Sequence, residues 1–152
     1  MQWIFFQYTV PNKPSKLRVY VWRKLKTLRA EKLLEGLYAL PLTDKTVEQF
    51  EWLSAEVSEM NGYAVLWKAE CKSKKQEQNL INSFKERSAK DYEEIQDMLL
   101  HTPEQSDKNW IDSIIRKYAD VRYHDYFDMQ KNYDIHIQLE QHYRLQKRGG
   151  KR

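Results

Sequence analysis

The first ten residues, MQWIFFQYTV, constrain the fold more than any other segment of the chain. Aromatic and β-branched side chains follow one another at residues 2–10 without a helical period, and Pro11 ends the run, which is typical of a β-strand. Side chains of a strand alternate between two faces, and both faces are apolar here. One face carries Trp3 and Phe5, and the other carries Ile4, Phe6 and Tyr8. A sheet that contains this strand must therefore be covered on both sides.

The residues that follow alternate between helical and strand patterns. Ser15 is positioned as the N-cap of a helix whose apolar stripe recurs at helical spacing. The stripe consists of Leu17, Val21, Leu25 and Leu28. Two short strand-like runs within residues 30–42 meet at Gly36, where glycine permits the positive φ of a tight hairpin. Thr43 is positioned to cap a second helix, and the alternation at residues 63–70 predicts a last strand.

The predicted order β-α-β-β-α-β is that of the ferredoxin-like split βαβ arrangement, so we expect an α+β fold with an antiparallel sheet. Residues 73–146 have helical spacing and are expected to form additional C-terminal helices, with a capped restart at Thr102 and Pro103. These helices would pack on the sheet or on a partner chain. We therefore predict a ferredoxin-like domain at 1–72, a helical extension at 73–146 and a disordered basic tail at 147–152.

Cysteine content and the character of the N-terminus indicate where the protein resides. A single cysteine, Cys71, excludes an intramolecular disulfide and a multi-cysteine metal site, which fits a reducing compartment. The apolar start lacks a basic n-region and is too short to span a bilayer, which requires about 20 apolar residues. We expect a cytoplasmic protein with no membrane partner and no cofactor.

Basic residues are concentrated in and around the predicted first helix. The formal net charge is only +4, but residues 12–32 contain eight lysines and arginines against Glu31 alone. Because the apolar stripe faces the core, the basic side chains point outward, where they can neutralise phosphate charge. A solvated helix face is the alternative interpretation. We expect Trp22, which lies among these residues, to be buried against the C-terminal helices rather than to serve as an exposed stacking platform. The candidate nucleic-acid contacts are Lys16, Arg18, Arg23, Lys26 and Arg29.

Catalytic patterns are sparse, and we predict a protein that is not an enzyme. The sequence has no glycine-rich phosphate loop and no nucleophile elbow. Tyr8 ends the first strand, where metal-assisted phosphodiester cleavage would require a carboxylate. A metal-dependent enzyme remains an open alternative, because carboxylates lie close to a histidine within a few residues. The candidate metal ligands are His124, Asp125 and Asp128.

Several short motifs, in order along the chain, resemble the N-terminal region of ChrB, the chromate-resistance regulator. The first motif is Pro14, Leu17, Arg18, Val19, Trp22, Arg23 and Leu25, and the second is Gly36, Leu37, Tyr38, Ala39, Leu40 and Pro41. The later motifs are Phe50, Glu51, Trp52 and Leu53, then Phe84, Arg87, Asp91 and Tyr92, and finally Asp125 and Phe127. The resemblance covers almost the whole chain.

This resemblance implies a ferredoxin-like domain with helical additions, distantly similar to the central domain of the phenylacetate-pathway repressor and to the small CRISPR integration subunit. Those relatives bind nucleic acid or belong to assemblies that do. The resemblance thus implies a homodimeric, DNA-binding transcription regulator related to chromate or stress resistance. The alternative is a protein that binds a small oxyanion such as chromate. Such a dianion needs two or three convergent donors, and Arg18 with Arg87 is the candidate pair.

Overall fold

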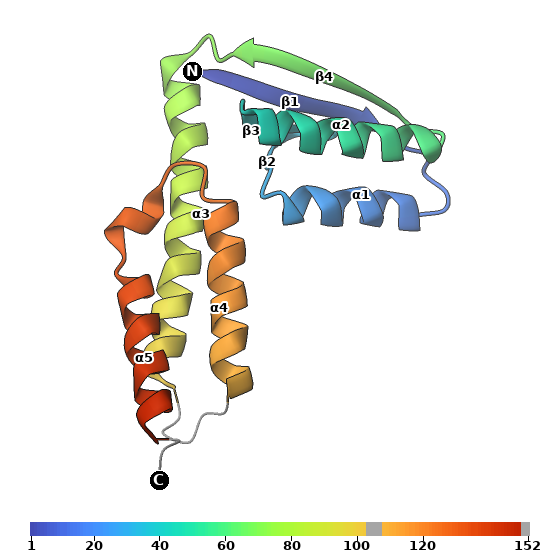
Figure 1. The fold of residues 1–152 in the computed structure, drawn as a ribbon. Coiled ribbons are helices and arrows are strands. Elements are labelled where there is room, and N and C mark those ends of the chain that lie inside the picture. Colours follow the sequence, from blue (N-terminus) through green and yellow to red (C-terminus); the bar gives the residue numbers. More distant parts are fainter. Residues whose placement is uncertain (103–107, 150–152) are drawn as a thin grey trace. The chain divides into compact units, whose positions relative to one another are not determined.

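The computed structural model describes residues 1–102 and 108–149 (Figure 1). The chain divides into two compact units, unit 1 (Met1–Leu80) and unit 2 (Ile81–Arg152). The elements of unit 1 are β1 (Gln2–Thr9), α1 (Lys16–Thr27), β2 (Glu31–Leu34), β3 (Leu37–Pro41), α2 (Asp44–Glu59) and β4 (Tyr63–Glu70). Those that follow are α3 (Lys74–Leu100), α4 (Lys108–Tyr123), the 3₁₀ helix η1 (Met129–Asn132) and α5 (Ile135–Gly149). The boundary between the two units falls inside α3, after Leu80. The domain boundary predicted at residue 72 lies earlier, in the loop that precedes α3.

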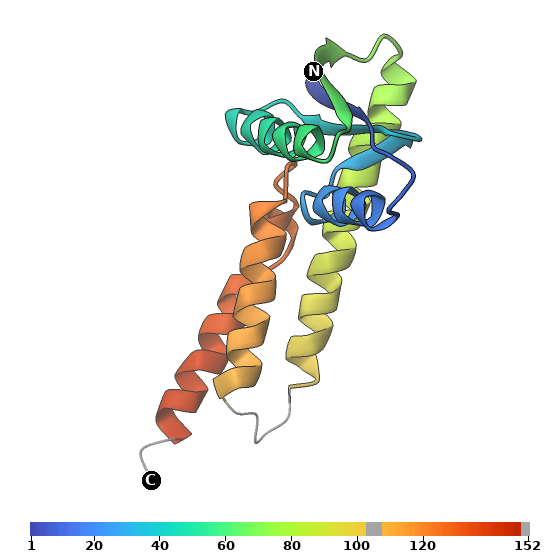
Figure 2. The same ribbon diagram turned by 90° about the vertical axis from the view of Figure 1, so that its right-hand side faces the viewer.

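Unit 1 contains the predicted antiparallel sheet, with strand order β2-β3-β1-β4. β3 lies between β1 and β2, and β1 lies between β3 and β4, so each βαβ unit is split by a strand of the other. Figures 1 and 2 show α1 and α2 on the same face of this sheet. The α+β, ferredoxin-like prediction is thereby confirmed, with helices added after β4.

The core of unit 1 forms where the apolar stripes of both helices meet one face of β1. The Phe6 ring lies 5.2 Å from the Phe50 ring of α2, centroid to centroid. Val21 and Leu25 of α1 are fully buried, as the helical spacing predicts. On the opposite face of β1, the buried Trp3 donates a hydrogen bond from Nε1 to Glu77 Oε1 of α3 at 3.0 Å. Both faces of the strand are therefore in use, as its two apolar sides require.

Local signals set the ends of the elements in unit 1. Thr43 forms a capping box with Thr46, whose N–H donates to Thr43 Oγ1 at 3.1 Å. Ser15 occupies the N-cap position of α1 but makes no side-chain cap hydrogen bond, because its backbone is already helical. Gly36 adopts φ +72° in the β2-β3 turn, as the hairpin prediction requires. Its carbonyl accepts from the Tyr8 N–H at 2.9 Å, which fixes the turn against the end of β1.

Unit 2 is built from helices that share an apolar core (Figure 1). The buried core residues are Tyr92, Ile95, Leu99, Ile114, Val121, Ile135 and Leu139. α5 continues through Lys147 and Arg148 to Gly149, so the prediction of a disordered tail from residue 147 is wrong for this part, and residues 150–152 lie outside the described ones. Pro103, the predicted restart, also lies outside them, and α4 begins at Lys108.

Within residues 1–102 and 108–149, no helix combines the length and the apolar character needed to cross a bilayer.

Candidate functional site

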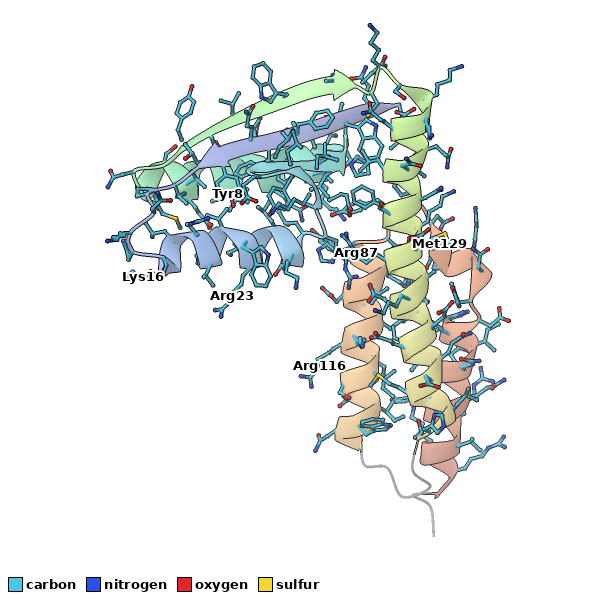
Figure 3. All side chains as sticks on the ribbon, turned by 180° about the vertical axis from the view of Figure 1, so that it is seen from behind. Tyr8, Lys16, Arg23, Arg87, Arg116 and Met129 are labelled. Carbon is cyan, nitrogen blue, oxygen red and sulfur yellow. The ribbon has the colours of Figure 1, made fainter. Side chains whose placement is uncertain are left out.

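The outer side of α1 carries exposed cations without carboxylate partners. Lys16, Arg18, Arg23 and Lys26 are all exposed, whereas Val21 points into the core. In Figure 3 the Arg23 side chain points away from the sheet. Within the described part of the chain, none of these four cations lies within ion-pair distance of a carboxylate. Their charge is therefore available to an anionic partner.

Arg29 differs from the other four predicted contacts, because it lies beyond the end of α1. Its N–H donates to the Lys26 carbonyl, and the Ala30 N–H donates to the Leu25 carbonyl, both at 3.0 Å. These two bonds form a Schellman motif, and Arg29 takes the left-handed position with φ +58° that glycine usually fills. Arg29 is half-buried and has interactions within the chain. The structure thus places it outside the row of outward-facing helical cations.

Aromatic side chains stand among these cations. Trp22 is 47% exposed, so the prediction that it is buried is wrong. The Lys26 Nζ atom lies 4.4 Å from the centroid of its ring, a cation-π contact. Trp22 follows the buried Val21 and so lies about 100° around the helix from the core stripe. At that angle, burial depends on whether another element covers the position, and here the indole stays in contact with solvent.

A groove separates α1 from the β2-β3 hairpin, and sequence reasoning did not predict it. This α1 groove has a volume of about 410 Å³. It is lined by Tyr8, Ser15, Arg18, Val19, Trp22, Lys32, Glu35 and Tyr38. A second hollow of about 260 Å³ shares Tyr8, Arg18 and Glu35 with it. Tyr8 appears in Figure 3 between the sheet and α1. The groove therefore joins a cation of the helix to phenols of the sheet.

The protonation states of the polar groups in the α1 groove follow from burial and from one ion pair. Burial raises the pKa of Tyr8 and of Tyr38, so both phenols stay protonated at neutral pH and can donate. Lys32 Nζ donates to Glu35 Oε2 at 2.7 Å, and this bond raises the pKa of Lys32 and lowers that of Glu35. Glu35 thus forms an ion pair with Lys32 and none with Arg18, although the Arg18 charge also helps to lower the pKa of Glu35.

A known protein family matches more than half of this chain. The family described as Protein ChrB, N-terminal, matches residues 18–108, which are 91 of the 152 residues. The chain belongs to the ChrB N-terminal family. The resemblance predicted from the motifs is thereby confirmed over residues 18–108, whereas Pro14, Leu17, Asp125 and Phe127 lie outside the match. Neither a curated protein nor a solved structure matches the chain.

The part shared with the ChrB N-terminal family contains Arg18, Arg23, Lys26 and Arg29. It also contains Arg87, the predicted oxyanion partner of Arg18. Arg18 lies on α1 in unit 1, whereas Arg87 lies on α3 in unit 2. The two candidate oxyanion donors therefore belong to different units, and their pairing stays a prediction.

The candidate metal ligands lie beyond the match to the ChrB N-terminal family, around the turn before η1 in unit 2. Asp125 accepts three hydrogen bonds, from the Tyr92 hydroxyl and from the N–H groups of Met129 and Gln130, at 2.8–2.9 Å. The buried His124 places Nδ1 2.9 Å from the Asp120 carbonyl oxygen. Among the residues that the structure describes, no three His, Cys, Asp or Glu side chains are grouped so as to hold a metal ion. The Asp125 carboxylate instead organises the turn.

Proposed function

We propose that this chain is a non-catalytic, DNA-binding transcriptional regulator related to chromate or stress resistance. The observation that carries the proposal is the outer side of α1, where exposed cations lack carboxylate partners within the described residues. Arginine and lysine side chains on one helix face can follow the phosphates of a duplex, and arginine can bind a phosphate in bidentate geometry. Membership in the ChrB N-terminal family supports a regulatory context.

Arg18, Arg23, Lys26 and Lys16 are the proposed phosphate contacts. Trp22 adds an exposed aromatic ring beside them, which can pack on sugar or base surfaces. We further propose that the protein acts as a homodimer, because a two-fold axis doubles the number of phosphates contacted by one α1 face.

A salt series tests DNA binding. Binding of genomic DNA fragments is measured by fluorescence anisotropy from low to physiological salt. If three of the four cations in each chain engage a phosphate, a dimer contacts about six phosphates, and the logarithm of affinity is expected to fall against the logarithm of the salt concentration with a slope of about −5. Absence of binding at low salt, or an affinity that does not depend on salt, contradicts the proposal.

Charge reversal tests the assignment to α1. The double variant Arg23→Glu and Lys26→Glu is expected to weaken DNA binding by at least about tenfold and to reduce the salt slope by about two per chain. Lys74→Glu with Lys75→Glu at the start of α3 is the matched control, since it changes net charge equally at exposed positions. Equal losses in the two double variants would indicate a general charge effect and would remove α1 from the interface.

A further inference from the structure

The α1 groove contains one uncompensated positive charge. Arg18 lines both hollows beside α1 and, among the described residues, has no carboxylate within ion-pair distance. Lys32 also lines the groove, but it is hydrogen-bonded to Glu35 at 2.7 Å. The charges of the lining residues therefore sum to +1, which suits a monoanion better than a dianion.

Neutral donors and an aromatic surface complete the groove. The Tyr8 and Tyr38 rings lie 6.3 Å apart, centroid to centroid, and both hydroxyls remain protonated because burial raises their pKa. Trp22 and Val19 contribute exposed apolar surface from α1. Small-molecule sites usually combine apolar and aromatic side chains with a few polar groups. The polar groups orient the ligand, and the apolar side chains bury its ring.

We propose that the α1 groove binds a small aromatic carboxylate, with its carboxylate on Arg18 and its ring against Trp22 and Val19. Arginine forms bidentate, charge-assisted hydrogen bonds with carboxylates, and the two phenols can donate to the oxygen atoms that remain. The site shares Arg18 and Trp22 with the proposed DNA-binding face, but binding of the carboxylate does not depend on DNA binding and is tested without DNA.

Size and charge disfavour a tetrahedral oxyanion as the occupant. The groove volume of about 410 Å³ lies within the range of about 300–1,000 Å³ found for small-molecule pockets. A tetrahedral oxyanion would leave most of this space to water and would bury little of the Trp22 ring. A dianion would also carry one negative charge more than the net charge of +1 on the lining residues can compensate.

Matched probes test the charge requirement. Binding of 2-naphthoate and benzoate, each compared with its neutral amide, is measured by titration calorimetry in the absence of DNA. The acid is expected to bind about tenfold more tightly than the amide. The reason is that one hydrogen bond to a charged group changes the affinity by about a factor of ten. In a parallel titration followed by NMR, the Trp22 indole N–H resonance is expected to shift on addition of 2-naphthoate.

Two substitutions on α1 locate the site. Arg18→Gln is expected to remove the preference for 2-naphthoate over its amide, and Trp22→Leu to weaken both probes to a similar extent. Arg23→Gln is the control, because Arg23 is exposed on the same helix but does not line the groove. Circular dichroism checks that each variant is folded.

Three outcomes overturn the inference. The first is that neither acid binds or that acid and amide bind equally. The second is that Arg18→Gln retains the full preference of the native protein for the acid. The third is that sulfate or adenosine monophosphate shifts the same Trp22 indole resonance and binds more tightly than 2-naphthoate. That result would assign the groove to a dianion.

Discussion

Replacing Asp125 by asparagine is expected to lower the free energy of unfolding by about 1–3 kcal/mol, since it leaves a partly buried donor without an acceptor. Both carboxylate oxygens are used: Oδ1 accepts from the Met129 N–H, and Oδ2 accepts from the Tyr92 hydroxyl and the Gln130 N–H. An asparagine amide would turn an NH₂ group toward one of these backbone donors, whichever way it is oriented. Urea unfolding followed by circular dichroism at 222 nm measures the loss, because unit 2 is mainly helical.

Asp128→Asn is the matched control for this prediction. Asp128 lies three residues further on, is exposed, and accepts a hydrogen bond from the side chain of Gln130 at 3.1 Å. It adopts φ +53°, a conformation that asparagine tolerates well. We expect a change of less than about 0.5 kcal/mol. If the two variants lose the same stability, Asp125 does not organise the turn in the way that its hydrogen bonds indicate.

Gly36→Ala is expected to destabilise unit 1 by about 2–4 kcal/mol. Gly36 has φ +72°, which costs an L-residue about 1–2 kcal/mol. A Cβ atom at this position would also lie 2.7 Å from the Tyr8 carbonyl oxygen, and this backbone atom cannot move aside without disturbing β1. Unfolding followed by tryptophan fluorescence measures the effect, because Trp3, Trp22, Trp52 and Trp67 all belong to unit 1.

Glu35→Ala serves as the comparison for Gly36→Ala. Glu35 is the preceding turn residue, is exposed, and makes only the surface ion pair with Lys32 among the bonds described here. We expect its unfolding midpoint to stay close to that of the native protein. A midpoint for Gly36→Ala that also stays close to the native value would show that the turn relaxes freely. Such a result would contradict the close approach of Gly36 to β1.

Elements that depend on local chemistry could be predicted from the sequence. The Thr43 cap and the Gly36 turn follow from neighbouring residues, and the structure shows both. The βαββαβ order follows from the periodicity of apolar residues, which depends on each segment alone. The prediction for Ser15 holds for its position only, because Ser15 has helical φ and ψ and its side chain makes no cap hydrogen bond.

Side chains at the edge of a stripe could not be placed in the same way. Trp22 borders the core stripe of α1, and the helical period fixes its angle but not what lies opposite. Helical spacing predicts that Arg29 lies on the basic face. The Schellman motif ends α1 before this residue and gives it a left-handed conformation, so helical spacing does not apply to it. The role of Asp125 depends on Tyr92, which is distant in sequence and is brought near by the packing of unit 2.

The sequence by itself determined the fold class of unit 1, the membership in the ChrB N-terminal family and the presence of a basic first helix. These properties rest on periodicity, on short motifs and on charge, which neighbouring residues encode. Only the tertiary structure decided that Arg18 and Trp22 share a groove with Tyr8 and Tyr38. The groove exists because the split βαβ topology sets the β2-β3 hairpin beside α1, and such a pairing depends on contacts between segments that no local pattern records.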